Sequence, residues 1–295
     1  MRDSGPLFVT SGDLVSDRRY KAAVELAARG DFAAAVDVLA QTLEAAPGFA
    51  TAWFALGASR ADPDDYRGAR LQLARLGAGA SAPAMTEPYV RRLFEQYAGR
   101  YDAALTEHLH YRGPTLLLDA VKSALENLGR PMRFASLLDL GCGTGLAGAV
   151  FRPFAARLVG VDLSPAMIAR AHAKGDYDRL TVGSLAAFLA DEIASKTTYD
   201  LVLAADVFVY LSEPAPVLAD IARVLTPRGV VAFTVETHAG AGAALLATLR
   251  FAHGEPYLRD AIAAAELKLL ALERAAVRTE KGAPVAGLVV VASAG

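Results

Sequence analysis

The chain has 295 residues, of which 54% are apolar, and its 30 basic and 32 acidic side chains leave a formal net charge of −2. This length accommodates one large domain and a smaller one, and the lack of basic excess argues against nucleic acid as the main partner. The single cysteine, Cys142, excludes an internal disulfide and a cysteine metal cluster. No apolar run of about 20 residues predicts a membrane span, and the first residues lack the apolar segment of a signal peptide, so we expect a cytoplasmic protein.

The N-terminal part of the chain divides into a polar lead and a helical region. Residues 1–15 are polar and turn-rich, and we expect them to be irregular. Helical periodicity covers residues 16–80, and Gly30 separates its first two apolar stripes. Trp53 stands 34 positions after Arg19 and begins the pattern Trp-x-x-Leu-Gly, which resembles the tetratricopeptide (TPR) repeat. The resemblance predicts about two repeats that either cap the main domain or bind a protein partner or a second copy of the chain, giving a homodimer.

A linker and further helices occupy residues 81–134. The stretch before Pro83 is rich in Gly and Ala, and amphipathic helices are predicted after Tyr89 and after Leu116. His108 and His110 stand two positions apart, so on a helix they do not face one another, and no third ligand stands nearby. We therefore predict no metal site.

The strongest chemical signal lies in residues 135–165. A short apolar run ends at Asp139 and is followed by three glycines at alternate positions, and a second apolar run ends at Asp162. This pattern predicts strand, glycine-rich turn, helix and strand, the opening of a parallel α/β sheet. Glycines allow positive φ and let a ligand approach the backbone closely. The acid after the second strand stands where a ribose diol needs a hydrogen-bond acceptor.

Two cofactor readings fit these residues. Gly143-Thr144-Gly145-Leu146-Ala147-Gly148 matches the G-x-G-x-x-G pattern of NAD(P)-dependent oxidoreductases. The longer run Leu138-Asp139-Leu140-Gly141-Cys142-Gly143-Thr144-Gly145, followed by Val161-Asp162-Leu163-Ser164-Pro165-Ala166-Met167, resembles the nucleotide site of class I S-adenosylmethionine (SAM) methyltransferases. The extra upstream Gly141 and the acid at the strand end favour the second reading.

The resemblance implies a role for each matching residue. Asp139 lies near the methionine ammonium, the glycines wrap the methionine and ribose, and Asp162 holds both ribose hydroxyls. Met167 packs on the adenine or, alternatively, only inside its helix. Tyr97 and Tyr101, in a lid segment before the first strand, touch the cofactor or pack between lid helices. The predicted cofactor site comprises Asp139, Gly141, Cys142, Gly143, Gly145, Asp162, Leu163, Met167, Ser184, Leu185, Asp206, Tyr97 and Tyr101.

Three of these positions need separate comment. Ser184 and Leu185 match a turn that is usually acidic in the family and lies near the adenine amino group, so here a backbone N–H is expected to substitute. Cys142 stands where a small side chain fits the turn, and we expect it to provide space, not reactivity.

The catalytic candidates follow two later strands. Asp206 and Tyr210 come directly after a continuous apolar run, and ligands of parallel sheets bind beyond the carboxyl ends of such strands. His253 lies in an irregular, glycine-bearing segment between residues 237 and 256. We rank them Asp206, His253 and Tyr210 as groups that accept a proton from the acceptor. The alternatives are a capping role for Asp206 and a structural role for His253.

The end of the chain distinguishes the two cofactor readings. Leu225-Thr226-Pro227-Arg228-Gly229 resembles the Leu-x-Pro-Gly-Gly turn of the methyltransferase family. Residues 267–278 and 284–292 read as strands joined by a tight turn, which makes them antiparallel. A seven-strand Rossmann-like α/β sheet whose last strand is antiparallel is the methyltransferase ending, whereas a nicotinamide-binding sheet would continue parallel. We therefore assign residues 135–295 to a SAM-binding domain.

The resulting expectation is methyl transfer from SAM to an oxygen or nitrogen of an acceptor, leaving S-adenosylhomocysteine. A small-molecule acceptor is favoured by the near-neutral charge. The alternatives are an NAD(P)-dependent oxidoreductase and a SAM-binding TPR adaptor without catalysis.

Overall fold

The computed structural model describes residues 11–46, 52, 85–99, 101–103, 111–246, 248–280 and 282–295. The chain forms two compact units. One comprises the described residues up to Gly99 together with Leu245–Arg250, and the other comprises the described residues from Tyr101 to Ala244 and from Phe251 to Gly295.

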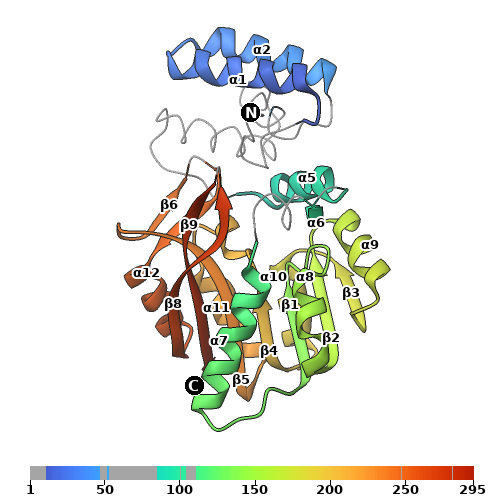
Figure 1. Cartoon of the computed structure of the whole chain (residues 1–295), viewed down its shortest axis with the longest axis vertical. Coiled ribbons are helices and arrows are strands. Elements are labelled where there is room, and N and C mark those ends of the chain that lie inside the picture. Colours follow the sequence, from blue (N-terminus) through green and yellow to red (C-terminus); the bar gives the residue numbers. More distant parts are fainter. Residues whose placement is uncertain are drawn as a thin grey trace. The chain divides into compact units, whose positions relative to one another are not determined.

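The first unit begins with two helices, α1 (Leu14–Ala28) and α2 (Phe32–Ala45), which lie side by side (Figure 1). Asp13 and Asp31 cap them by accepting backbone N–H bonds from the first turn. Gly30 turns the chain between the helices with φ of +84°, which confirms the predicted break. The second predicted repeat, which contains Trp53, lies outside the described residues. The same unit contains α5 (Glu87–Tyr97), capped by Thr86.

The second unit is built on one sheet. Its long strands are β1 (Phe134–Leu140), β2 (Ala155–Asp162), β3 (Arg179–Val182), β4 (Tyr199–Ala204), β5 (Leu225–His238), β8 (Leu267–Glu280) and β9 (Ala283–Ala294). Strands β3, β2, β1, β4 and β5 are parallel in that order, and β9 is antiparallel to both β5 and β8. The antiparallel ending is confirmed.

Two short strands were not predicted. β7 (Phe251–Gly254) extends the pairing along the end of β5, where Thr237 aligns with His253, and β6 (Ala243–Leu245) neighbours β7. The sheet of the described residues therefore has nine strands instead of the seven expected. With three and four residues, β6 and β7 are too short to show an alternating pattern, and glycines interrupt the segment around them.

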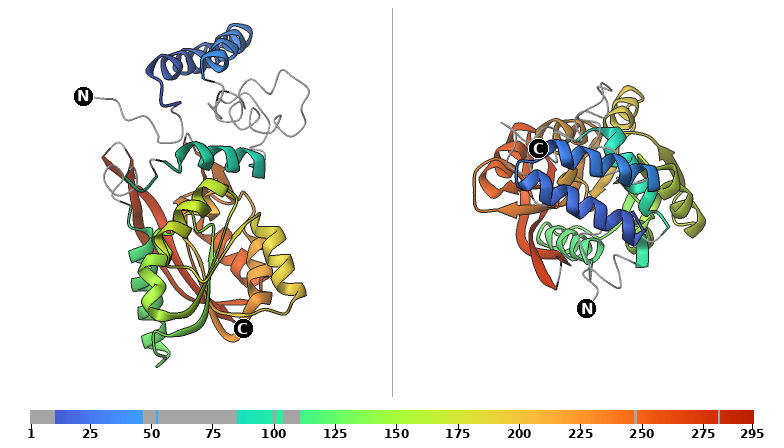
Figure 2. Two further views of the ribbon diagram at one scale, coloured as in Figure 1. Left: turned by 90° about the vertical axis from the view of Figure 1, so that its right-hand side faces the viewer. Right: turned by 90° about the horizontal axis from the view of Figure 1, so that it is seen from above.

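Helices cover both faces of this sheet (Figure 2). They are α6 (Tyr101–Ala103), α7 (Gly113–Asn127), α8 (Leu146–Phe151), α9 (Pro165–Lys174), α10 (Leu185–Ala194), α11 (Ala215–Val224) and α12 (Glu255–Ala264), with 3₁₀ turns η2 (Arg152–Phe154) and η3 (Phe208–Tyr210). Successive strand residues alternate between two cores. Leu137 and Leu201 pack with α7, whereas Leu138 and Val202 pack with α10, α11 and α12. The strands are thus buried on both faces, as their continuous apolar runs predicted.

Local signals at the carboxyl edge of the sheet are also confirmed. Ser164 caps α9 by accepting the Met167 N–H at 3.1 Å, and Pro165 is the first helical residue. Because β1, β2 and β4 are parallel, the loops that follow them lie at the same end of the sheet. In the part of the chain described here, no helix is long and apolar enough to cross a membrane.

Candidate active site

The loop between β1 and α8 depends on its glycines. Gly141, Gly143 and Gly145 have φ of +63°, +54° and +89°, which is the left-handed region predicted for them. A Cβ at Gly141 would come within 2.6 Å of a Val207 methyl group. The loop therefore packs closely against the residues that follow β4, and no other residue type fits its backbone without strain.

Asp139, the acidic residue near the end of β1, is buried, with 1% of its surface exposed. The Tyr177 hydroxyl donates a 2.6 Å hydrogen bond to its Oδ2, and its Oδ1 has no hydrogen-bond partner among the described residues. Burial raises the pKa of Asp139 to about 7, the Tyr177 hydrogen bond opposes the rise and the nearby Asp162 charge adds to it. A buried acceptor oxygen without a donor is costly, so this carboxylate fits a cationic or donor ligand.

Tyr177 itself was missed by the sequence reasoning. Its ring packs over the glycines of the loop and of β2, because a Cβ at Gly160 would lie 2.8 Å from the ring and a Cβ at Gly148 would overlap the hydroxyl group. Gly148, the third glycine of the G-x-G-x-x-G pattern, thus makes room for Tyr177. This packing accounts for the glycine without a dinucleotide.

Asp162, at the end of β2, holds the glycine loop from the other side. Its Oδ2 accepts the Gly143 N–H at 2.9 Å, and its Oδ1 accepts the Ser164 N–H at 2.8 Å. The carboxylate is 7% exposed. These bonds fix the carboxylate against the loop.

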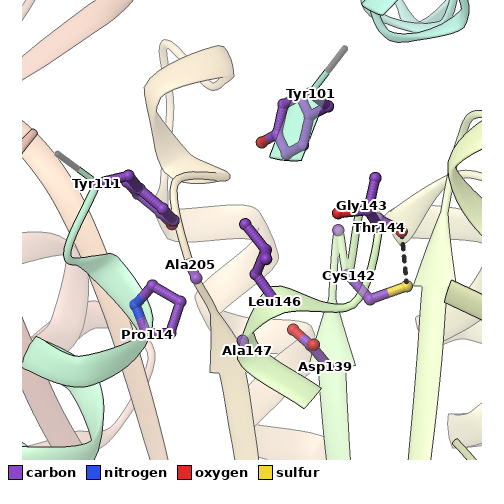
Figure 3. Close-up of a pocket in the computed structure, with 11 residues that line it drawn as sticks. Tyr101, Tyr111, Pro114, Asp139, Cys142, Gly143, Thr144, Leu146, Ala147 and Ala205 are labelled. Atoms are coloured by element: carbon purple, nitrogen blue, oxygen red, sulfur yellow. Dashed lines mark hydrogen bonds between the residues drawn. The ribbon is translucent and has the colours of Figure 1, made fainter. Parts of the chain in front are cut away.

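A pocket opens beside Asp139 (Figure 3). Its empty space is about 300 Å³, part of it open to solvent. Figure 3 shows Tyr101, Tyr111 and Pro114 arranged around the space opposite the glycine loop. The lining residues are Tyr101, Tyr111, Pro114, Asp139, Gly141, Cys142, Gly143, Thr144, Leu146, Ala147 and Ala205. Of the predicted cofactor residues, the pocket brings together Tyr101, Asp139 and part of the glycine loop.

The short helix α6 is fastened to the glycine loop. The Asp102 carboxylate accepts a hydrogen bond from the Thr144 hydroxyl and forms a 2.7 Å ion pair with Lys174 of α9. The adjacent Tyr101 ring lies 3.8 Å from the position of a Cβ on Gly143. From the sequence we predicted a role for Tyr101 and none for Asp102. Tyr97 belongs to the other compact unit, so its contact with the cofactor stays a prediction.

Asp206 follows Ala205 directly and has an unusual backbone. Its φ is +62°, and its N–H donates to Thr234 Oγ1 of β5 at 2.9 Å. A non-glycine residue in this region costs about 1 kcal/mol or more and persists only where its surroundings hold it. The capping and catalytic alternatives for Asp206 both remain compatible with this position at the carboxyl end of β4.

The other two catalytic candidates lie deeper. Tyr210 ends η3 and is 8% exposed. His253 has no exposed surface, its Nε2 lies 2.9 Å from the Leu211 carbonyl oxygen, and burial lowers its pKa. Its ring also stacks on Tyr257. These contacts favour the structural alternative for His253, which holds the chain after η3.

The remaining predicted contacts serve local packing in this structure. Met167 has no exposed surface, which favours the helix-packing alternative. Ser184 caps α10 by accepting the Ala187 N–H, and Leu163 and Leu185 are half-buried. Cys142 is buried, and burial together with Asp139 and Asp162 raises its thiol pKa, so it lacks the character of a reactive thiolate.

No group of three metal-ligating side chains occurs within the described ranges. His108 and His110 lie outside the described residues.

Comparison with known proteins gives a consistent picture. A family model described as a methyltransferase domain matches residues 138–231. Methyltransferase-like protein 27 of Homo sapiens is 33% identical over 147 residues, which cover 49% of this chain and 57% of that protein. A ubiquinone biosynthesis O-methyltransferase of Rhodopseudomonas palustris is 30% identical over 95 residues, or 32% of this chain and 37% of that protein. The chain thus spans less than two thirds of these relatives.

Two solved structures share the fold. One is a Burkholderia thailandensis 1,6-didemethyltoxoflavin-N1-methyltransferase with bound 1,6-didemethyltoxoflavin and S-adenosylhomocysteine, with a TM-score of 0.52, 22% identity and coverage of 73% of this chain and 93% of that one. The other is a magnesium protoporphyrin IX methyltransferase from Synechocystis with bound SAM, with a TM-score of 0.50, 14% identity and coverage of 73% and 100%. Residues 138–231 therefore match a methyltransferase domain, and the sheet that contains them has the fold of these two methyltransferases.

Proposed function

We propose that this chain transfers a methyl group from SAM to an oxygen or nitrogen atom of a small acceptor and releases S-adenosylhomocysteine. The observation that carries the proposal is Asp139, which lines the pocket beside the glycine loop and whose buried Oδ1 has no donor among the described residues. The SAM ammonium group is a donor of the charge and size that this oxygen lacks.

The two carboxylates divide the cofactor between them in this proposal. Asp139 takes the ammonium group, and the left-handed glycines leave the backbone bare where the methionine and ribose approach. Asp162 takes the ribose hydroxyls. Its oxygens accept backbone N–H bonds from Gly143 and Ser164, which hold the carboxylate beside the loop.

Bound SAM supplies a methyl group on a sulfonium, which is already a good leaving group. The chain then has to orient the acceptor and exclude water. We assign to Asp206 the task of accepting the acceptor's proton or of positioning its hydroxyl or amine. Support comes from the strained backbone of Asp206 and the bond to Thr234 that holds it at the carboxyl end of β4.

A small acceptor is supported by the walls of the pocket. Tyr101, Tyr111 and Pro114 give one side of it aromatic and apolar surface, which can contact a small organic acceptor. The names of two similar proteins also refer to small molecules, since one acts in ubiquinone biosynthesis and the other is bound to 1,6-didemethyltoxoflavin.

We further propose that α1 and α2 form the first of two TPR-like repeats. Support comes from the helix pair itself and from the 34-residue spacing of Arg19 and Trp53. In this proposal the repeats recruit a protein partner or a second copy of the chain. The alternative is a helical cap on the methyltransferase domain.

Titration calorimetry with SAM, S-adenosylhomocysteine and NADH tests the cofactor assignment. We expect both sulfur nucleosides to bind and NADH not to bind. Asp139→Asn should weaken SAM binding roughly 10-fold or more, because a charge-assisted hydrogen bond contributes about 1.5–3 kcal/mol. Asp220→Asn is the matched control, since Asp220 lies on α11 and pairs only loosely with Arg223 at 3.5 Å.

Transfer itself is tested with methyl-labelled SAM and a panel of phenols, hydroxy acids and amines. Label in an acceptor, lost in Asp206→Asn with SAM binding retained, is the expected result. NADH binding without SAM binding would instead support the oxidoreductase alternative. SAM binding with no transfer to any acceptor would support the adaptor alternative.

A further inference from the structure

A second pocket lies beside the amino end of β5, whereas the glycine loop lies at the carboxyl ends of the parallel strands. Its walls come from the chain after α7, the first residues of β5 and β8 and the last residues of β9. The lining residues are Leu128, Arg130, Pro227, Arg228, Lys268, Leu270, Ser293 and Ala294, around about 530 Å³ of empty space that includes open solvent. The C label of Figure 1 marks this end of the unit, away from α6.

Three cationic side chains converge on this pocket. Arg130, Arg228 and Lys268 come from three separate segments, and within the described ranges none of them forms an ion pair or a side-chain hydrogen bond with a carboxylate. Partial burial and the neighbouring Arg228 charge lower the pKa of Arg130. The charge is therefore concentrated locally in a chain whose formal net charge is −2.

The one carboxylate that favours the charged form of Arg130 is already engaged. Asp200 accepts backbone N–H bonds from Ala135 and Ser136 and a hydrogen bond from the Thr226 hydroxyl. It acts on Arg130 through its charge and not through a bond. The three cations thus lack a bound anionic partner from the described part of the chain.

The sequence marks the same place. Within the turn Leu225-Thr226-Pro227-Arg228-Gly229, Arg228 stands where the family pattern has glycine. Gly229 cannot carry a side chain, because a Cβ there would lie 2.9 Å from the Tyr199 carbonyl oxygen. The exposed side chain at position 228 is therefore a feature of this chain that the methyltransferase site does not use.

We propose that this pocket binds the phosphate group of a small phosphate monoester. Two guanidinium groups and an ammonium group supply the donors that phosphate oxygens require. Leu128, Leu270 and Pro227 line the same pocket and offer apolar contact to the organic part of such a molecule. The Ser293 hydroxyl is a further donor on the rim.

This site is separate from the proposed methyltransferase pocket and does not rest on it. Arg228 stands at the start of β5, whereas Glu236 lies near its carboxyl end. At the rise per residue of a β-strand, the two ends of the sheet are roughly 25 Å apart. A ligand at one end cannot touch a ligand at the other. The two proposals can consequently fail independently.

Calorimetry on the full chain with phenyl phosphate tests the proposal, with inorganic phosphate and benzoate as comparison probes. We expect saturable binding of phenyl phosphate that is tighter than binding of inorganic phosphate or benzoate. Arg228→Gln and Lys268→Gln should each weaken it roughly 10-fold or more, the value of one charge-assisted hydrogen bond. Both side chains are exposed, so these variants should keep the fold.

Arg223→Gln is the matched control, because it removes the same charge from the exposed face of α11. Asp139→Asn serves as a second control and should bind phenyl phosphate as the wild type does. No saturable binding, equal weakening by Arg223→Gln, or loss of binding in Asp139→Asn would each overturn the proposal.

Discussion

The Tyr177 hydroxyl donates to one oxygen of Asp139 at 2.6 Å, while the other oxygen of this buried carboxylate has no partner among the described residues. The acid is thus oriented by Tyr177 and left half satisfied. Its pKa of about 7 follows from burial, with the Asp162 charge adding to the rise. Protonation of Asp139 therefore has two opposite effects. It stabilises the fold without ligand, and it weakens the binding of a cationic ligand.

The first prediction concerns stability without ligand. The folded pKa of Asp139 lies above its unfolded value of 3.8, so the folded state holds a proton that the unfolded state loses. Its contribution is therefore fully present below about pH 4 and is lost as the pH rises through about 7. Asp139→Asn removes this loss because an amide oxygen can still accept from Tyr177. Its melting temperature should match that of the wild type near pH 4 and exceed it at pH 8 in differential scanning fluorimetry.

The second prediction concerns SAM affinity. Attraction of an ammonium group requires ionised Asp139, so the affinity of the wild type should fall as the pH drops below about 7. The decline should approach 10-fold per pH unit, and Asp139→Asn should bind weakly at every pH. Calorimetry between pH 5.5 and 8.5 measures both curves. If the affinity of the wild type were as independent of pH as that of Asp139→Asn, the assignment of the ammonium group to Asp139 would be contradicted.

The third prediction uses the glycines around Tyr177. Gly148→Ala places a methyl group on the Tyr177 hydroxyl, and the variant should lose about 1–3 kcal/mol of stability through overpacking. Displacement of Tyr177 should also weaken SAM binding through Asp139. Gly183→Ala is the control, because a Cβ there meets nothing within 4 Å. Chemical denaturation distinguishes the two, and equal midpoints would refute the packing argument.

The fourth prediction concerns the attachment of α6. Thr144→Val keeps the shape of a buried side chain but removes the donor to Asp102. We expect the Tyr101 segment to separate from the glycine loop more often, and SAM to dissociate roughly 3- to 10-fold faster, the value of one intramolecular hydrogen bond. Stopped-flow displacement measures the rate. Arg152→Gln, which breaks an ion pair with Asp178, is the control and should leave the rate unchanged.

The fifth prediction concerns Thr234. Thr234→Val removes the acceptor of the Asp206 N–H and leaves the left-handed backbone without its anchor. If Asp206 faces the acceptor, kcat should fall while the KM for SAM stays within about 2-fold. Restoration of activity by Thr234→Ser would show that the hydroxyl is what matters. A raised KM for SAM with unchanged kcat would place the effect in the cofactor site instead.

The features predicted correctly from sequence rest on local patterns. The positive φ of Gly141, Gly143 and Gly145, the cap at Ser164 and the antiparallel final hairpin each follow from residues within a few positions of one another. The missed features need long-range contacts. Tyr177 is 38 positions from Asp139, and Asp102 is 42 from Thr144. No periodicity or spacing connects such pairs before the fold brings them together.

The candidate site divides in the same way. The glycine loop after β1 could be predicted because it needs glycine at fixed positions, a requirement of the backbone itself. The other candidate residues depend on which side chains the topology exposes, and here the burial of His253 and Met167 favours structural roles that their sequence context left open. A histidine or methionine has the same sequence signal in a core and in a site.

The position of β9 sets a condition on how the protein is made. Because β9 lies between β5 and β8, one edge of β5 stays unpaired from Val230 to Glu236 until residues 283–294 join the sheet. The strands made before β9 must therefore wait with this edge open, and a chaperone that shields sheet edges would act on the chain during that interval.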